Sequence, residues 1–316
     1  MKKLTLLPLS FFSTAIIVFG QISTTKVASK TEETVYIPYD STKNFIGKDV
    51  TKYVGQEFYL PGESIDMRKY GYSDFFTQCS EKFAGGPVYK PMVDKSYRSK
   101  YDDLAGKYFK VLAVFKSQDV KSTNFCIKLQ EKQSNDTVYY NYDSEHWTAF
   151  PFVVVGFFEK QKKQLIGKEF VFYDVTLRGS TDIVTGKPVT IKTGQKWKCL
   201  DLTVEERYYH LSLVIQNLLG EKTTIRVGDV LDGSEGAKSG FNTLEVSNYR
   251  KKFGNKFFET ILQHKVSIGM SKEMCIFSWG KPERINETIT SGTKREQWVY
   301  EDGYLYFTNG KLTTIQ

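Results

Sequence analysis

Histidine and cysteine are scarce in this chain, which has 3 His and 4 Cys among 316 residues. His146, His210 and His264 are widely separated in the sequence, and no two of them have the spacing of metal ligands. No two cysteines are separated by only two residues, as zinc and redox motifs require. The sequence therefore predicts neither a metal site nor a cofactor.

The motifs of common catalytic sites are also missing. No Gly-Xaa-Ser-Xaa-Gly elbow occurs, and no cysteine has protease-like neighbours. The glycine-rich segment 232–240 resembles a phosphate loop, but Asp232 stands where the first glycine is needed and Ala237 stands before Lys238-Ser239. We expect no catalytic residue and interpret this segment as part of an interdomain linker. An enzyme with a site between domains remains an alternative.

Long apolar runs are absent outside the N-terminus. Lys2 and Lys3 precede an uncharged stretch over residues 4–19, and Gly20 comes before a cleavage point at Gln21. This pattern predicts a signal peptide over residues 1–20. The stretch contains Pro8 and is shorter than the ~20 apolar residues of a spanning helix. An uncleaved anchor is the alternative, and we expect no transmembrane segment in the mature chain.

The net charge is +8, yet the lysines are scattered, and the densest run is Lys160, Lys162 and Lys163. We interpret the excess as a solvated basic surface and expect no nucleic-acid partner. Four cysteines allow three disulfide pairings. Cys126, Cys199 and Cys275 lie in apolar segments, which favours buried thiols, and the disulfide state of these three and of Cys79 stays open.

Aromatic residues are abundant, with 20 Tyr and 23 Phe, and they favour strands. One short pattern recurs: Gly, then Gln or Lys, a variable residue, and an aromatic residue at the start of an alternating segment. The copies are Gly55-Gln56-Glu57-Phe58, Gly106-Lys107-Tyr108-Phe109, Gly167-Lys168-Glu169-Phe170 and Gly194-Gln195-Lys196-Trp197. Each predicts a strand that follows a glycine turn, with the aromatic side chain pointing inward.

Similar strands follow the second and fourth copies in the same order, which indicates a duplicated antiparallel β unit. We predict unit 1 over residues 45–159 and unit 2 over 160–232, with linkers at 21–44 and 233–248. Small barrels and small sandwiches both fit this spacing. The apolar stretch 150–158 is interpreted as a buried strand.

The C-terminal part, 249–316, has a different period. Apolar residues recur at helical spacing over 249–262, where Gly254 interrupts the pattern and Asn255 is a candidate cap. A second helix is expected over 271–279 with Ser271 as its cap. Three or four strands are expected, and the clear ones are 296–300, 304–308 and 311–316, separated by the hairpin signals Asp302-Gly303 and Asn309-Gly310.

Four motifs of this part resemble the SmpA/OmlA (BamE-like) domain. They are Ile268-Gly269-Met270-Ser271-Lys272-Glu273-Met274, Trp279-Gly280-Lys281-Pro282, Gln297-Trp298-Val299-Tyr300 and Tyr304-Leu305-Tyr306-Phe307-Thr308-Asn309-Gly310-Lys311-Leu312. The resemblance covers residues 250–316 and implies two helices on a three-stranded antiparallel sheet, a fold shared with β-lactamase-inhibitor proteins. It also implies a relation to a small outer-membrane lipoprotein of the β-barrel assembly machinery. A cysteine that would carry the lipid is absent after the cut site.

Together these patterns predict an α+β, mostly β, exported and non-enzymatic binding or scaffold protein. We place it in the periplasm or at the cell surface of a Gram-negative-type bacterium, with a protein or envelope component as partner. The alternative is a protein inhibitor or a cell-wall-binding accessory protein. Tyr304 and Tyr306 alternate with the inward Leu305 and Phe307, so we expect the two tyrosines to form a partner-binding face beside a final edge strand. Packing of this face on the preceding β domain is the alternative.

Overall fold

The structure, a computed structural model, describes residues 39–79, 86–116, 123–146, 150–206, 210–231, 238–290 and 292–316. The predicted signal peptide and most of the first predicted linker lie outside these residues. The described chain is a strand-rich mixture of helices and strands, with three antiparallel sheets of six, five and four strands. Within these ranges no sheet closes into a barrel, and no helix has both the length and the apolar character needed to cross a membrane.

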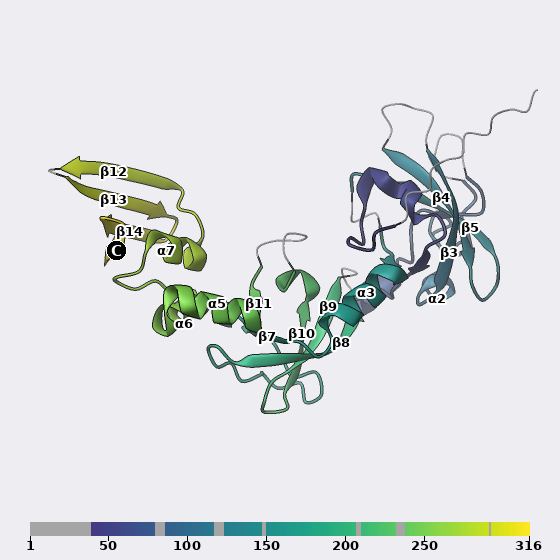
Figure 1. Cartoon of the computed structure of the whole chain (residues 1–316). Helices are drawn as coiled ribbons and strands as arrows, with labels where there is room; N and C mark the ends of the chain where they lie inside the picture. Colours follow the sequence, from purple (N-terminus) through teal and green to yellow (C-terminus); the bar gives the residue numbers. More distant parts are fainter. Residues whose placement is uncertain are drawn as a thin grey trace, which may run out of the picture. The chain divides into compact units, whose positions relative to one another are not determined.

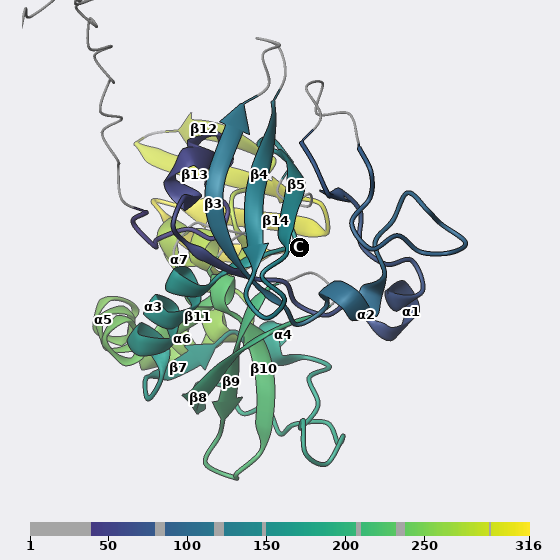
Figure 2. The same cartoon turned by 90° about the vertical axis from the view of Figure 1, so that its right-hand side faces the viewer.

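The first sheet has the strand order β2-β5-β4-β3-β1-β6, and its three long strands run side by side in Figure 2. Its strands are β1 Glu57–Tyr59, β2 Phe75–Phe76, β3 Tyr108–Lys116, β4 Asn124–Glu131, β5 Thr137–Asp143 and β6 Val153–Val154. Short helices precede or interrupt them: η1 Gly47–Tyr53, α1 Ile65–Arg68 and α2 Tyr101–Leu104. The core is aromatic, because the ring of Phe152 lies 5.0 Å from the rings of both Phe58 and Tyr140.

The second sheet has the order β10-β9-β8-β7-β11. Its strands are β7 Glu169–Phe172, β8 Lys196–Val204, β9 Leu211–Gln216, β10 Lys222–Arg226 and β11 Gly240–Asn242. The associated helices are α3 Val155–Leu165, α4 Asp174–Leu177 and η3 Val227–Asp229.

The four glycine–aromatic segments have the predicted conformation. Their glycines have φ angles of 83°, 72°, 81° and 74°, in the left-handed region that other residues rarely adopt. The aromatic residue of each segment is buried: Phe58, Phe109, Phe170 and Trp197. The glycine therefore turns the chain into a strand, and the aromatic ring is the first large side chain that enters the core.

Two predictions for this region are wrong. Only Val153–Val154 of the stretch 150–158 is a strand, and α3 begins at Val155. Phe157, Gln161 and Leu165 are buried at a spacing of four residues, so the helical period prevails over the β preference of Val155. The predicted linker 233–248 is also partly structured, because β11 pairs with β7 and a helix starts at Thr243.

The C-terminal part consists of helices followed by a sheet with the order β12-β13-β14-β15. The elements are α5 Thr243–Phe253, α6 Asn255–Leu262, α7 Lys272–Trp279, β12 Arg284–Thr290, β13 Thr293–Tyr300, β14 Gly303–Thr308 and β15 Lys311–Ile315. Figure 1 shows α7 against one face of this sheet. Phe258 and Met274 from the helices share a core with Trp298, Leu305 and Phe307 from the sheet.

The structure corrects three details of the C-terminal prediction. The sheet has four strands and not the three that the resemblance implies, because β12 precedes the three clear ones. The first helix starts at Thr243, where the Asn242 side chain accepts hydrogen bonds from two backbone amides. Gly254, at φ 80°, separates α5 from α6 and is itself the N-cap of α6, so Asn255 is not a cap. The Ser271 cap is confirmed, since its hydroxyl accepts from the Met274 amide.

Candidate binding surface on the C-terminal sheet

The C-terminal sheet has one face toward the helices and one face away from them. Leu305 and Phe307 are buried on the helix side, whereas Tyr304 is 42% exposed and Tyr306 is half-buried on the opposite side. The predicted alternation of these four residues is confirmed. We call the side that carries the two tyrosines the outer face.

A row of hydrogen-bonded side chains crosses the outer face. The Asn286 amide on β12 donates to Gln297 Oε1 on β13 at 2.9 Å. Gln297 Nε2 donates to the Tyr306 hydroxyl on β14 at 3.0 Å, and that hydroxyl donates to Gln316 Oε1 at 2.8 Å. Because each side chain is held by its neighbour, the row presents planar amides and a phenol in fixed orientations.

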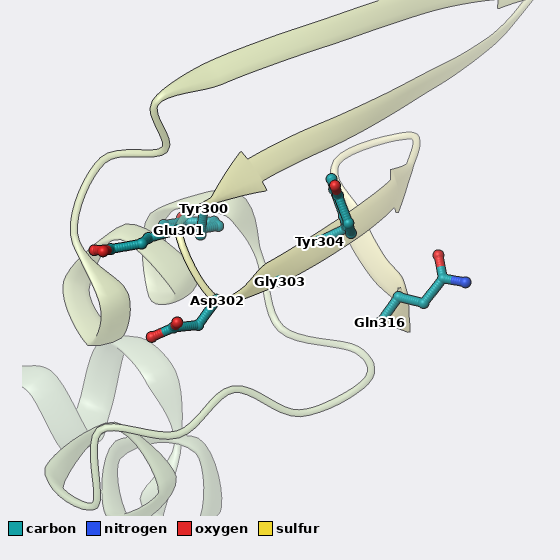
Figure 3. A pocket seen from close by; sticks show the side chains of 6 residues that line it. All are labelled: Tyr300, Glu301, Asp302, Gly303, Tyr304 and Gln316. Carbon is teal, nitrogen blue, oxygen red and sulfur yellow. The ribbon is translucent and has the colours of Figure 1, made fainter.

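An open hollow of about 530 Å³ lies at the end of this row, beside the turn between β13 and β14. Figure 3 shows its lining residues: Tyr300, Glu301, Asp302, Gly303, Tyr304 and Gln316. Tyr304 and Gln316 exchange both backbone hydrogen bonds, at 2.7 and 2.9 Å. A Cβ atom on Gly303 would lie 2.7 Å from the Gln316 carbonyl oxygen, so the close approach requires glycine. The hollow therefore has a fixed backbone floor with two carboxylates, those of Glu301 and Asp302, at its rim.

The two edges of the sheet differ. The expected open edge at the final strand is partly occupied, because Leu312 donates to the Met270 carbonyl and accepts from the Gly269 amide, each at 2.8 Å. On the opposite edge, β12 pairs with β13 on one side only, and no described segment pairs with its other side. The open edge is therefore β12.

Exposed apolar side chains lie on β12 and on α7. Ile285 and Ile289 of β12 are 50% and 66% exposed, and they lie opposite Trp298 and Lys294 of β13. Ile276 and Trp279 of α7 are also partly exposed, at 40% and 36%. The helix layer thus leaves β12 uncovered, and four large apolar side chains face solvent on these two elements.

The position of this edge strand could not be predicted from the sequence. Residues 284–290 contain only two apolar side chains among polar ones, so the alternation of Ile285, Glu287 and Ile289 gives a weak strand signal. The hairpin geometry of β12 and β13, with Thr290 opposite Thr293, reveals the strand only once the fold is known.

A buried carboxylate lies beneath the surface. Glu296 of β13 accepts from Lys272 at 2.9 Å, from Lys294 at 3.2 Å and from Trp298 Nε1 at 3.0 Å. Burial by itself would raise the pKa of Glu296, but these hydrogen bonds from cationic and indole groups outweigh burial and lower it. Glu296 is fully partnered, so its role is to join α7 to the sheet.

The histidines lie in three separate places. His146 Nδ1 lies 2.7 Å from Asp143 Oδ2 on the surface, His210 precedes β9, and the His264 ring packs 4.5 Å from the Tyr173 ring. Burial lowers the pKa of His264. In the ranges that the structure describes, no three metal-ligating side chains come together.

Comparisons with known proteins give no relative for this chain. No protein family model matches it, and neither the curated proteins nor the solved structures contain a match.

Proposed function

We propose that this chain is an exported, non-enzymatic binding or scaffold protein whose C-terminal sheet binds a protein partner. The observation that carries the proposal is the open edge of β12, a seven-residue strand with an unpaired side and exposed apolar residues. An edge strand with unpaired amides and carbonyls accepts an extended segment of another protein, and neighbouring apolar side chains add affinity.

The partner in this proposal is an extended peptide segment that adds a strand to β12. Ile285 and Ile289 would contact its alternate side chains, while Ile276 and Trp279 of α7 would contact them from the helix layer. The outer face, with Tyr304 and Tyr306, would extend this contact area on the other side of the sheet.

The predicted signal peptide and the resemblance to the SmpA/OmlA domain support an envelope location, in the periplasm or at the cell surface. The two β-unit sheets support a scaffold role, and we propose that they are duplicated units. When the edge strand β2 is left out, the first sheet has the order β5-β4-β3-β1-β6, which corresponds strand by strand in chain order to β10-β9-β8-β7-β11 of the second sheet. Such units would act as a spacer that carries the C-terminal domain.

The outer face favours a second candidate function, a cell-wall-binding accessory protein or an inhibitor. The row of Asn286, Gln297, Tyr306 and Gln316 offers planar amides and a phenol of the kind that hydrogen-bond sugar hydroxyls or peptide groups. Retention of the purified chain on insoluble cell-wall polymer, with loss on Gln297→Ala, would favour this function.

A comparison of three tagged chains in the native cell tests the proposal. The wild type, an edge variant with Ile285→Lys and Ile289→Lys, and a control with Leu218→Lys are crosslinked and purified. Leu218 is 90% exposed in the turn between β9 and β10, so its replacement should be neutral. We expect one protein partner to be captured by wild type and control, and lost with the edge variant.

The melting temperature separates binding from folding in this test. Ile285 and Ile289 are at least half exposed, so the edge variant should keep the melting temperature of the wild type. A partner retained equally by all three chains, or no partner that depends on β12, would refute the proposed binding edge.

A further inference from the structure

The hydrogen-bond pattern of the C-terminal sheet shows which residues of β12 face the open edge. Backbone N–H and C=O groups along a strand alternate between its two neighbours. The Asn309 amide donates to the Lys294 carbonyl at 2.9 Å, so Lys294 and every second residue after it in β13 direct these groups toward β14. The β12 residues opposite them are Ile285, Glu287 and Ile289. Their N–H and C=O groups therefore point away from β13, toward the open edge.

The side chains of these three residues lie on the helix side of the sheet. Ile285 is directly opposite Trp298, which is buried on that side, and strand alternation places Glu287 and Ile289 on the same side. The Glu287 side chain is 42% exposed, and both isoleucines are at least half exposed. An incoming strand therefore meets an apolar, an acidic and an apolar side chain at successive positions on this side.

The carboxylate of Glu287 shares its nearest cation with a second carboxylate. Lys294 Nζ lies 2.7 Å from Glu287 Oε2 and 3.2 Å from Glu296 Oε1, so one ammonium group serves two carboxylates on directly opposite residues. Lys272, which lies 2.9 Å from Glu296, belongs to α7. Of these four charged residues, only Glu287 belongs to the edge strand. A residue that a partner places opposite Glu287 is therefore directly paired with an acidic side chain.

A second copy of this chain is a poor partner for the same edge. Two copies of β12 could pair antiparallel with Ile285 of each opposite Ile289 of the other, and this register would cover all the exposed isoleucines. It would also place the two Glu287 side chains directly opposite each other. Like charges at directly opposite positions destabilise a strand pair, and a charged residue among apolar ones is a known protection of edge strands against self-pairing.

We propose that Glu287 determines which segment β12 accepts: an extended protein segment with Lys or Arg between two apolar residues at alternate positions. The inference rests on the proposed function of β12 as a binding edge, and it names the chemistry of the partner. The two apolar side chains of the segment contact Ile285 and Ile289, and its cation lies opposite the Glu287 carboxylate. The same carboxylate disfavours pairing between two copies of the chain.

Two synthetic peptides that differ in one residue test the proposal. One contains Val-Thr-Lys-Thr-Val and the other Val-Thr-Glu-Thr-Val, each with a fluorescent label, and binding to the purified chain is measured by anisotropy at low salt. We expect the Lys peptide to bind about tenfold more tightly, because an opposite-charge pair replaces a like-charge pair. The difference should shrink at high salt, since these charges are partly exposed.

Three variants assign the preference to one side chain. Glu287→Gln should bind both peptides with nearly equal affinity. The matched control is Glu283→Gln, which removes the same charge from an exposed residue just before β12 and should keep the preference. The edge variant with Ile285→Lys and Ile289→Lys should bind neither peptide.

The possible failures are distinguishable. Equal binding of both peptides by the wild type, lost with the edge variant, would overturn selection by Glu287 and leave the binding edge intact. No binding of either peptide would refute the binding edge and this inference with it. A wild-type dimer in analytical ultracentrifugation that the edge variant abolishes would show that the occupant of β12 is a second copy of the chain.

Discussion

Phe109 and Trp197 occupy matching positions in two different sheets. Phe109 of β3 lies directly opposite Phe58, and Trp197 of β8 lies directly opposite Phe170. Both side chains are fully buried, and in both strands the register shifts two residues later, after Val111 and after Cys199. Each sheet therefore has one aromatic pair next to a bulge, which joins β3 to β1 in the first sheet and β8 to β7 in the second.

Truncation of either ring should be strongly destabilising. Replacement of Phe109 or Trp197 by Ala removes a large side chain from a closed core, at a cost of ~3–5 kcal/mol in the free energy of unfolding. Trp197→Phe keeps most of the volume and should cost less than ~1.5 kcal/mol. Urea denaturation of the three variants measures these differences. Losses below about 1 kcal/mol for both Ala variants would show that the two rings are not equivalent core positions.

The sequence predicted these positions because glycine and aromatic residues act locally. A glycine at positive φ and an inward ring are properties of a few adjacent residues, so four copies at 55, 106, 167 and 194 could be recognised. Strand β11 could not be recognised, since its three residues pair with β7 across a long stretch of sequence. The start of α3 was hidden by three consecutive valines: Val153 and Val154 do form a strand, and only the β preference of Val155 is overridden by packing.

The stability of the C-terminal part should depend on pH through Glu296. The pKa of this carboxyl is lowered in the folded chain below its ordinary value of 4.5, so the unfolded chain binds the proton more tightly. The stabilisation is present above pH 4.5 and is lost as the pH falls through the lowered folded pKa. Melting temperatures measured from pH 7 downward should therefore fall more steeply for the wild type than for Glu296→Gln.

The same variant should be less stable at neutral pH. Glu296→Gln replaces a charged acceptor of Lys272 and Lys294 by a neutral one, which we expect to cost roughly 1–3 kcal/mol. The matched control is Glu301→Gln, a change at an exposed carboxylate on the neighbouring turn. Parallel pH profiles for the wild type and Glu296→Gln would show that the Glu296 network does not set the acid sensitivity.

Gly303 should not tolerate a side chain. Its φ angle is outside the left-handed region, so strain alone does not require glycine there, but a Cβ would lie 2.7 Å from the Gln316 carbonyl oxygen. Gly303→Ala should therefore break the backbone pair between Tyr304 and Gln316 and cost about 1–3 kcal/mol. The control is Gly156→Ala in α3, where the nearest atom belongs to a flexible glutamine side chain at 3.4 Å, and helix propensity favours alanine. Equal stability of the two variants would contradict the close approach.

If the chain is exported, the mature protein should lack residues 1–20. Lys2, Lys3 and the apolar stretch 4–19 predict cleavage before Gln21, so intact-mass measurement of the chain purified from the cell envelope should begin at or near Gln21. An uncleaved chain that retains Met1 would indicate the anchor alternative. A chain found only in the cytoplasmic fraction would contradict the export on which the proposed location rests.

Part of the candidate binding surface could be predicted from the alternation of inward and outward residues along the strand. The outward position of Tyr304 and the inward position of Leu305 follow from strand period alone. The open edge did not follow, because strand order is set by contacts that the sequence does not encode locally. The partly occupied edge of β15 depends on the Gly269–Met270 segment, which arrives from the loop before α7.

Tyr304 and Tyr306 should differ in what their replacement changes. The Tyr304 side chain is exposed, so Tyr304→Ser should leave the melting temperature nearly unchanged. The Tyr306 hydroxyl links Gln297 to Gln316, so Tyr306→Phe should lower the free energy of unfolding by about 1 kcal/mol.

If the outer face binds a partner, Tyr304→Ser and Tyr306→Ser together should weaken capture, because exposed, rigid tyrosines contribute strongly to interfaces. Thr308→Ser on the same strand is the matched control and should retain capture. A large fall in melting temperature for Tyr304→Ser would instead show that this face packs against another part of the chain, and the binding role of the two tyrosines would then be lost.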